Sequence, residues 1–226
     1  VRRLLKSAKI KNLVLEKLLF QKPSDYESVS RLLKKTKTKT WVNCCMRMMA
    51  PYQAIKNDFA GKQIYYNVSG SQFGLVTNAI HYIDHMAYLT GSTDFEVFTS
   101  FLDNRYILSK RKGFLELTGT LLVKFKNGSE GVFTCYRAGN SPIMIQIYID
   151  NERYLGKESE GKAWLAKSEE AWKWREIEAS IPFQSQMTTE LAVSILETGK
   201  CLLPSYEESA KLHLQLLEPL RKFLNK

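Results

Sequence analysis

The middle of the chain limits the possible folds most strongly, because it carries a series of aromatic and β-branched runs separated by turn residues. Such runs are typical of β-strands, since branched and aromatic side chains pack well on a pleated surface. Asn127-Gly128 lies between two of them, and Asn-Gly fits the tight turn of a β-hairpin. The sequence therefore predicts a large, mostly antiparallel sheet built from residues 95–102, 106–110, 114–126, 131–137, 143–150 and 153–156.

Alternation within these strands predicts two different faces for the sheet. Leu115 and Leu117 alternate with Glu116 and Thr118, so we expect helices to cover one face while the other is more polar or used for association. The strands from residue 114 to 149 nevertheless carry apolar side chains on both parities, which leaves more apolar surface than a monomer usually exposes. We therefore expect a homo-oligomer in which this sheet packs face to face across a two-fold axis.

The first 45 residues alternate between helical and strand patterns. Residues 1–9 are predicted to be the tail of a basic helix, residues 13–15 a short buried strand and residues 41–45 a second strand. Between the strands, Ser24 and Glu27 have the spacing of a capping box at the start of a helix. This order is typical of a parallel, doubly wound sheet. We therefore predict that the segment 1–45 is the closing portion of a dinucleotide-binding (Rossmann) domain.

The segment 46–226 is predicted to form a second domain, for substrate binding and dimerisation. Residues 75–89 carry apolar side chains at helical spacing, and Gly91 ends that helix. Further helices are predicted at residues 52–59 and 186–198 and, after a capping box of Ser205 with Glu208, up to residue 224; a strand is predicted at residues 63–68. The predicted fold class is thus α/β (α+β): a remnant of a parallel Rossmann sheet, then a large, mostly antiparallel sheet with helices on one face.

Composition indicates an ordinary globular protein, with 44% apolar and 25% charged residues. The apolar runs are far shorter than the roughly 20 residues that span a bilayer, and no export leader opens the chain, so we expect a cytoplasmic protein without a membrane partner. The four cysteines lack metal-type spacing and are expected to be reduced thiols.

The net charge of +10 has three interpretations: solvated surface, attraction of an anionic substrate such as a nucleotide-activated sugar, or nucleic-acid binding. The charge is spread along the chain apart from two basic runs at residues 34–39 and 110–112. Neither run is interleaved with aromatic residues. We therefore expect solvated surface and no nucleic-acid partner.

Three short stretches place polar residues where a single site could collect them. Glu16-Lys17 follows the first predicted strand, Arg47 follows the second, and His81 lies in the predicted helix 75–89. In open parallel sheets, ligands collect beyond the carboxyl ends of the strands. A lysine there can hold a hydroxyl or carbonyl oxygen, an arginine can grip hydroxyls, carboxylates or phosphates, and a neutral imidazole can accept a proton.

In this order, residues 14–20, 41–52 and 73–91 resemble the glucose-fructose oxidoreductase and inositol dehydrogenase family of nicotinamide-dependent sugar oxidoreductases. The resemblance implies hydride transfer between NAD or NADP and a ring carbon of a sugar or nucleotide-activated sugar. Residues 201–209 resemble the end of bacterial members that act on sugars for surface polysaccharide. The resemblance also implies oligomers formed through the sheet.

The resemblance gives each residue of the predicted site a role. Lys17 polarises the substrate oxygen and, with Glu16, contacts the cofactor; His81 is the general acid/base; Arg47 and Asn78 position the substrate. Each role has a structural alternative. Glu16-Lys17 could be ordinary surface and Arg47 could form a structural salt bridge. An unperturbed pKa near 6.5 suits His81 to acid/base work, but His81 could instead be a core histidine.

The chain also departs from the family pattern. Leu18 replaces the proline that follows the lysine, Thr77 replaces the aspartate four residues before the histidine, and residues 43–45 differ from the stretch before the arginine. No Gly-x-Gly-x-x-Gly occurs in the chain, so we expect no useful NAD(P) binding by these 226 residues alone. These departures leave a non-catalytic, sheet-mediated dimerisation or binding module as the alternative function.

A metal site is not expected. His81 and His85 are four residues apart, but Tyr82 stands where a zinc protease has glutamate, and His213 is the only other histidine. The tryptophans after the strands are expected to be buried against the sheet, with stacking on a sugar ring as the alternative: Trp164, Trp172 and Trp174.

Overall fold

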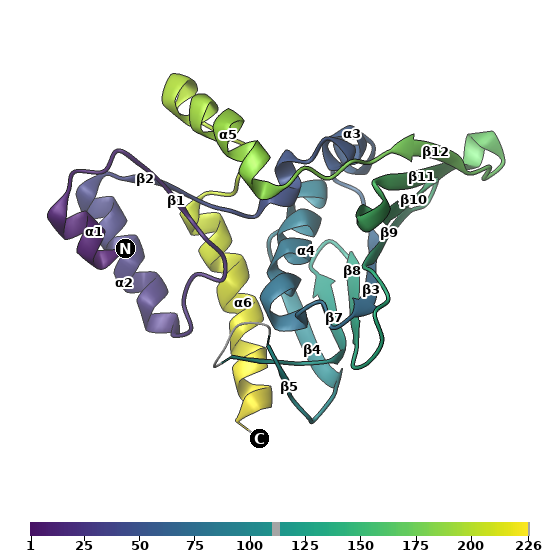
Figure 1. The fold of residues 1–226 in the computed structure, drawn as a ribbon, viewed down its shortest axis with the longest axis horizontal. Coiled ribbons are helices and arrows are strands. Elements are labelled where there is room, and N and C mark those ends of the chain that lie inside the picture. Colours follow the sequence, from purple (N-terminus) through teal and green to yellow (C-terminus); the bar gives the residue numbers. More distant parts are fainter. Residues whose placement is uncertain (110–113, 226) are drawn as a thin grey trace.

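The computed structural model describes residues 1–109 and 114–225. Its N-terminal part is a two-stranded parallel sheet with two helices, at one side of the molecule in Figure 1. The predicted helix, strand, helix, strand order and the parallel pairing are confirmed by α1 (Arg2–Ser7), β1 (Asn12–Leu15), α2 (Pro23–Thr36) and β2 (Lys39–Val42). The predicted domain boundary after residue 45 stays a prediction. The basic run 110–112 and the end of the predicted strand 106–110 lie outside the described residues.

Helix α2 begins differently from the prediction. The capping box of Ser24 with Glu27 is wrong: Lys22 is the N-cap, Pro23 opens the helix, and no side chain within the described residues caps it. Proline suits the first turn because its φ is already helical and its missing N–H leaves no bond unmade. The apolar face is as predicted, with Val29 buried.

The rest of the chain is built around a large mixed sheet. Within the described residues it has eight strands in the order β12-β11-β10-β9-β3-β8-β7-β4. Every neighbouring pair is antiparallel except β3 and β8, which are parallel. The strands are β3 (Tyr65–Ser71), β4 (Phe95–Leu102), β7 (Gly119–Phe125), β8 (Glu130–Tyr136), β9 (Met144–Ile149), β10 (Glu152–Lys157), β11 (Lys162–Lys167) and β12 (Arg175–Glu178).

The hairpin predicted at Asn127-Gly128 is confirmed. It joins β7 to β8, with Lys124 paired to Glu130, and Gly128 has a φ of 87° that favours glycine. The single strand predicted for residues 114–126 is wrong, because the chain breaks into two.

The first piece, β6 (Leu115–Glu116), pairs with β5 (Ile107–Leu108) outside the large sheet. At the break, Gly119 has a φ of 94°, and a Cβ there would stand 2.6 Å from the carbonyl oxygen of Phe101. Any other residue would clash with that backbone. Because of this break, the predicted alternation is also wrong: Glu116 is buried and Leu115 is exposed.

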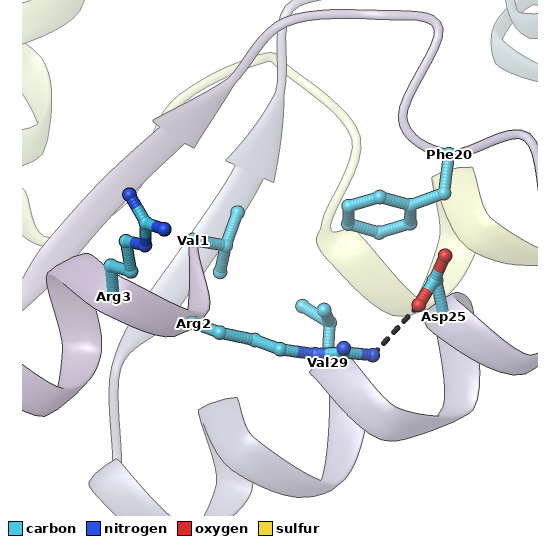
Figure 2. Close-up of a pocket in the computed structure, with 6 residues that line it drawn as sticks. All are labelled: Val1, Arg2, Arg3, Phe20, Asp25 and Val29. Atoms are coloured by element: carbon cyan, nitrogen blue, oxygen red, sulfur yellow. Dashed lines mark hydrogen bonds and ion pairs between the residues drawn. The ribbon is translucent and has the colours of Figure 1, made fainter.

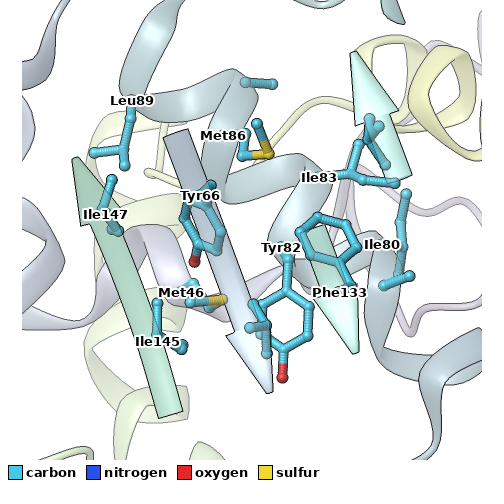
Figure 3. Packing of buried hydrophobic residues seen from close by; sticks show 14 of the residues in the cluster. Met46, Tyr66, Ile80, Tyr82, Ile83, Met86, Leu89, Phe133, Ile145 and Ile147 are labelled. Carbon is cyan, nitrogen blue, oxygen red and sulfur yellow. The ribbon is translucent and has the colours of Figure 1, made fainter. Parts of the chain in front are cut away.

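Helices cover one face of the large sheet, as predicted. In Figure 1, α4 (Leu75–Thr90) and α6 (Tyr206–Leu224) lie between the sheet and the N-terminal part, with α3 (Ala50–Phe59) beside them. Figure 3 shows the interface, in which side chains of α4 meet inward side chains of β3, β8 and β9. Each such buried apolar side chain contributes about 1.5–3 kcal/mol. The labelled members include Ile80, Ile83, Met86, Tyr66, Phe133, Ile145 and Ile147.

The last two helices differ in how firmly they are held. Helix α6 begins as predicted, since the Ser205 hydroxyl accepts a hydrogen bond from the backbone N–H of Glu208 at 3.1 Å. The side chain of Glu208 does not complete the capping box, because it binds Arg47 instead. Helix α5 (Gln184–Thr198) projects from the body in Figure 1 and exposes Leu196.

The tryptophans follow the prediction only in part. Trp164 on β11 is half-buried, but Trp172 and Trp174 are exposed, so buried packing was wrong for these two. Trp172 instead lies against the guanidinium of Arg153, whose carbon is 4.7 Å from the ring centroid. None of the helices in the described part of the chain is long and apolar enough to span a membrane.

Candidate functional site

The turn after β1 brings Lys17 to the N-terminal end of α4. Its Nζ donates to the carbonyl oxygen of Thr77 at 2.7 Å and to Oδ1 of Asn78 at 3.0 Å. Leu18 does not prevent this geometry, and the Lys17-Leu18 peptide bond is cis. Burial lowers the pKa of Lys17, while nearby thiols and carboxylates oppose that effect. An ammonium carries three donors, so one N–H remains beyond these two bonds.

Asn78 is engaged at both ends of its amide. Its Oδ1 accepts from Lys17, and its Nδ2 donates to the carbonyl oxygen of Phe73 at 2.5 Å. The Thr77 hydroxyl donates to the carbonyl oxygen of Gly74 at 3.1 Å, which closes the first turn of α4. The structure therefore joins Asn78 to Lys17, as one shared site requires. Its contact with substrate stays a prediction.

His81 lies one helical turn beyond Thr77 on α4 and is partly exposed. Its Nδ1 is buried and has no hydrogen-bond partner among the residues that the structure describes. Burial lowers its pKa to about 3, with further lowering by the positive charge of Lys17 and by His213. The expected near-neutral pKa is thus wrong, and the imidazole is neutral at pH 7. That form can accept a proton, but only as a weak base.

Arg47 forms a structural salt bridge, which is the alternative that the sequence left open. It lies on the short helix η1 (Cys45–Met48), and its Nε and Nη2 each donate to one carboxylate oxygen of Asp84 at 2.8 Å. Its Nη2 also donates to Glu208 at 2.6 Å, and its guanidinium lies over the ring of Tyr88. This buried cluster ties η1 to α4 and α6. Substrate contact by Arg47 stays a prediction.

Glu16 fastens three chain segments together. Its Oε1 accepts from Nδ2 of Asn43 and from Nε2 of Gln184, both at 2.7 Å. These bonds join the turn after β1 to the end of β2 and to the start of α5. Its predicted contact with the cofactor stays a prediction.

Glu116 is a site residue that the sequence reasoning missed. It is only 4% exposed, and its Oε2 accepts from the backbone N–H of Val76 at 3.0 Å, in the first turn of α4. The alternating pattern placed it on a polar face, which gave no sign of this role. The signal that could have found it is a lone carboxylate just before the glycine at the strand break, Gly119.

His85 does not join His81 in a shared cluster. Its ring is fully buried, its Nδ1 is 2.8 Å from the hydroxyl of Tyr66, and the ring of Tyr52 lies 4.3 Å away between centroids. Within residues 1–109 and 114–225, no group of three or more His, Cys, Asp or Glu side chains is placed to hold a metal ion. All four cysteines are free.

The structure has a hollow of about 340 Å³, and Figure 2 shows the side chains that line it. It is next to α1 and α2, where Arg2 forms an ion pair with Asp25 at 2.7 Å. None of the predicted site residues lines it. The lining residues are Val1, Arg2, Arg3, Phe20, Asp25 and Val29.

Comparisons with known proteins identify the fold. No family model matches the chain, and no curated protein matches its sequence. Solved structures do match: a UDP-N-acetylglucosamine 3-dehydrogenase from Acidithiobacillus ferrooxidans has a TM-score of 0.71 at 9% identity, over 91% of this chain and 68% of that one.

Two further structures give the same result. An oxidoreductase from Agrobacterium radiobacter in complex with NAD+, L-tartaric acid and magnesium has a TM-score of 0.69 at 15% identity, over 94% of this chain and 70% of that one. The dehydrogenase MviM from Clostridium difficile has a TM-score of 0.64 at 16% identity, over 92% and 70%. At such low identities the likeness establishes the fold, so the family resemblance is confirmed at that level.

Proposed function

We propose that this chain is the substrate-binding and catalytic portion of an NAD(P)-dependent sugar oxidoreductase. The observation that carries the proposal is the placement of Lys17. Its ammonium is fixed by Thr77 and Asn78, keeps one N–H for a ligand, and lies near His81, which is neutral. Two distant segments of the chain, the turn after β1 and the first turns of α4, thus lie together beyond the end of a parallel strand, which supports one site there.

Each residue would perform a separate task on a sugar hydroxyl. Lys17 would donate its remaining N–H to the oxygen and stabilise the negative charge that develops there. His81 would accept the hydroxyl proton as the carbon–oxygen bond becomes a carbonyl, and would return it in the reverse direction. NAD(P), when bound, supplies the acceptor or donor of the hydride. Asn78 would hold Lys17 in place.

In this proposal, residues of this chain contact only the nicotinamide end of the cofactor. The turn after β1 offers Lys17 and Glu16 at the carboxyl edge of the parallel strands. The diphosphate needs a glycine-rich loop at a helix N-terminus, and the sequence contains no Gly-x-Gly-x-x-Gly. The proposal therefore assigns diphosphate binding to residues outside these 226.

The proposed substrate is a nucleotide-activated sugar. One structure with this fold is named a UDP-N-acetylglucosamine 3-dehydrogenase, and attraction of an anionic substrate is one interpretation of the net charge of +10. The proposed setting is the cytoplasmic synthesis of surface polysaccharide, as the resemblance of residues 201–209 implies.

Calorimetry with NADH and NADPH tests the proposal. The natural gene product that carries this chain should bind one of them with micromolar affinity, whereas the 226 residues alone should bind neither. A gene product that binds no nicotinamide nucleotide would overturn the enzyme proposal. Micromolar binding by the 226 residues alone would overturn the account of the missing loop.

A non-catalytic association module is the second candidate function. The observation that favours it is the outer face of the large sheet, which exposes Tyr65, Phe98, Phe101 and Tyr136. Such a patch is suited to a second copy of the chain. Self-association together with absent nicotinamide binding in the gene product would select this candidate.

A further inference from the structure

The site differs from the family pattern in one charge. Thr77 stands where the family commonly has a carboxylate, four residues before His81. Two features of this place disfavour the positive charge of an ammonium. Lys17 is partly buried, and it bonds to the first turn of α4, a 16-residue helix whose N-terminus carries a partial positive charge.

A carboxylate does lie at this helix end, but it comes from another element. Helix α4 has Gly74 as its N-cap, and its first turn is capped from β6 by Glu116, whose Oε2 accepts from Val76 at 3.0 Å. A Cβ built on Gly74 would stand 3.3 Å from Oε1 of Glu116 and 3.5 Å from Nδ2 of Asn78. Asn78 in turn holds Lys17 at 3.0 Å. One compact cluster therefore contains the ammonium, its amide partner and the carboxylate.

Other ionisable groups also face Lys17. Burial is the main influence that opposes its positive charge. The groups around it are two carboxylates, two thiols and two imidazoles: Glu16, Glu116, Cys44, Cys45, His81 and His213. Both imidazoles are neutral at pH 7. Glu16 is exposed and bonded to two amides, yet it raises the pKa of Lys17 more than Glu116 does. Glu116 is the buried carboxylate among them.

We propose that Glu116 is a positioning residue that keeps Lys17 an ammonium at the N-terminus of α4, and that it replaces, from β6, the carboxylate missing at Thr77. Its effect on catalysis rests on the proposed function, but its coupling to Lys17 does not. A helix cap alone would need only an acceptor oxygen for Val76. To keep Lys17 protonated, Glu116 must also carry a negative charge.

The variant Glu116→Gln separates these two roles, because the amide keeps an acceptor oxygen for Val76 and loses the charge. The probe is the pH midpoint of Lys17, read from the ¹³C chemical shift of its Cε in the 226-residue chain. In E116Q the midpoint should move to lower pH, and in Glu116→Asp it should stay closer to that of the parent. Glu130→Gln is the matched control, since it removes an exposed carboxylate paired with Lys124 on β8 and should leave the midpoint unchanged.

A folded E116Q with an unchanged Lys17 midpoint would overturn the proposal, as would an equal shift in E130Q. If E116Q does not fold, the unmodified chain still gives a test. The carboxyl ¹³C shift of Glu116 should move at the pH where Lys17 loses its proton, and a flat trace at that pH would overturn the proposal.

The kinetic consequence is measured in the gene product. The upper pH limit of kcat should move to lower pH in E116Q, with about a tenfold loss at the alkaline end, and E116D should restore much of it. A shifted Lys17 midpoint without any oxidoreductase activity would reject the proposed function and keep the coupling. Normal oxidoreductase activity with an unshifted Lys17 midpoint would keep the proposed function and reject the coupling.

Discussion

Mild acid should destabilise this protein through its histidines. The chain has three, and burial lowers the pKa of His81 and His85 to about 3 and that of His213 to about 4. In the unfolded chain each would titrate near 6.5. The unfolded state therefore binds protons between pH 7 and 5 that the native state cannot bind, so the free energy of unfolding falls as the pH falls.

The magnitude follows from these values. A histidine with an unfolded pKa of 6.5 and a folded pKa well below 5 removes about 2 kcal/mol between pH 7 and 5, so three remove about 6 kcal/mol. Burial raises the pKa of Asp84 to about 6, which works in the opposite direction and returns about 1 kcal/mol. Glu158 has a raised pKa for the same reason and adds to that opposition. The expected net loss is therefore below about 5 kcal/mol, which is still a large share of the stability of an ordinary domain.

Urea denaturation at pH 7, 6 and 5 at constant ionic strength measures this loss. The variant His85→Gln should reduce the difference between pH 7 and 5 by about 2 kcal/mol, because one titrating group is removed. Tyr66→Phe is the matched control, since it breaks the same 2.8 Å contact but leaves His85 to titrate. Equal stability of the parent at pH 7 and 5 would show that the histidines do not destabilise the protein in mild acid, and so would a full pH dependence in H85Q.

Three further predictions concern the ion cluster, the site and the sheet. Arg47→Ala should lower the free energy of unfolding by about 3 to 5 kcal/mol, because Asp84 is left buried without its cation; a loss below about 1 kcal/mol in urea would contradict this. Lys17→Ala and His81→Ala should each cut turnover of the gene product about a hundredfold or more while leaving the fold intact, and normal turnover in H81A would show that His81 is a core residue without a catalytic role. The parent chain should sediment as a dimer and Phe101→Glu as a monomer; a monomeric parent at micromolar concentration rules out the sheet interface.

Local patterns were enough for much of the fold. Asn127-Gly128 gives a tight hairpin wherever strands flank it, and Gly91 ends α4 with a φ of 77°, so both features could be predicted from neighbours in sequence. The parallel pairing of β3 with β8 could not, because their paired residues lie 65 positions apart and no local signal encodes that partner.

The candidate site shows the same division. Strand ends and the helix pattern correctly brought Lys17 and Asn78 together, 61 residues apart in sequence. The burial of Glu116 depended on a break in the strand that an alternating pattern does not reveal. The low pKa of His81 arises from packing and from the charge of Lys17, neither of which a histidine's own neighbours specify.

Hydride transfer by the gene product is the most direct test of the proposed activity. Absorbance at 340 nm, followed with NAD+ or NADP+ and nucleotide-activated sugars beginning with UDP-N-acetylglucosamine, reports reduction of the nicotinamide. We expect turnover with at least one such sugar and its loss in Lys17→Ala. Turnover that is unchanged in K17A, or a folded gene product that binds and reduces no nicotinamide nucleotide, would contradict it.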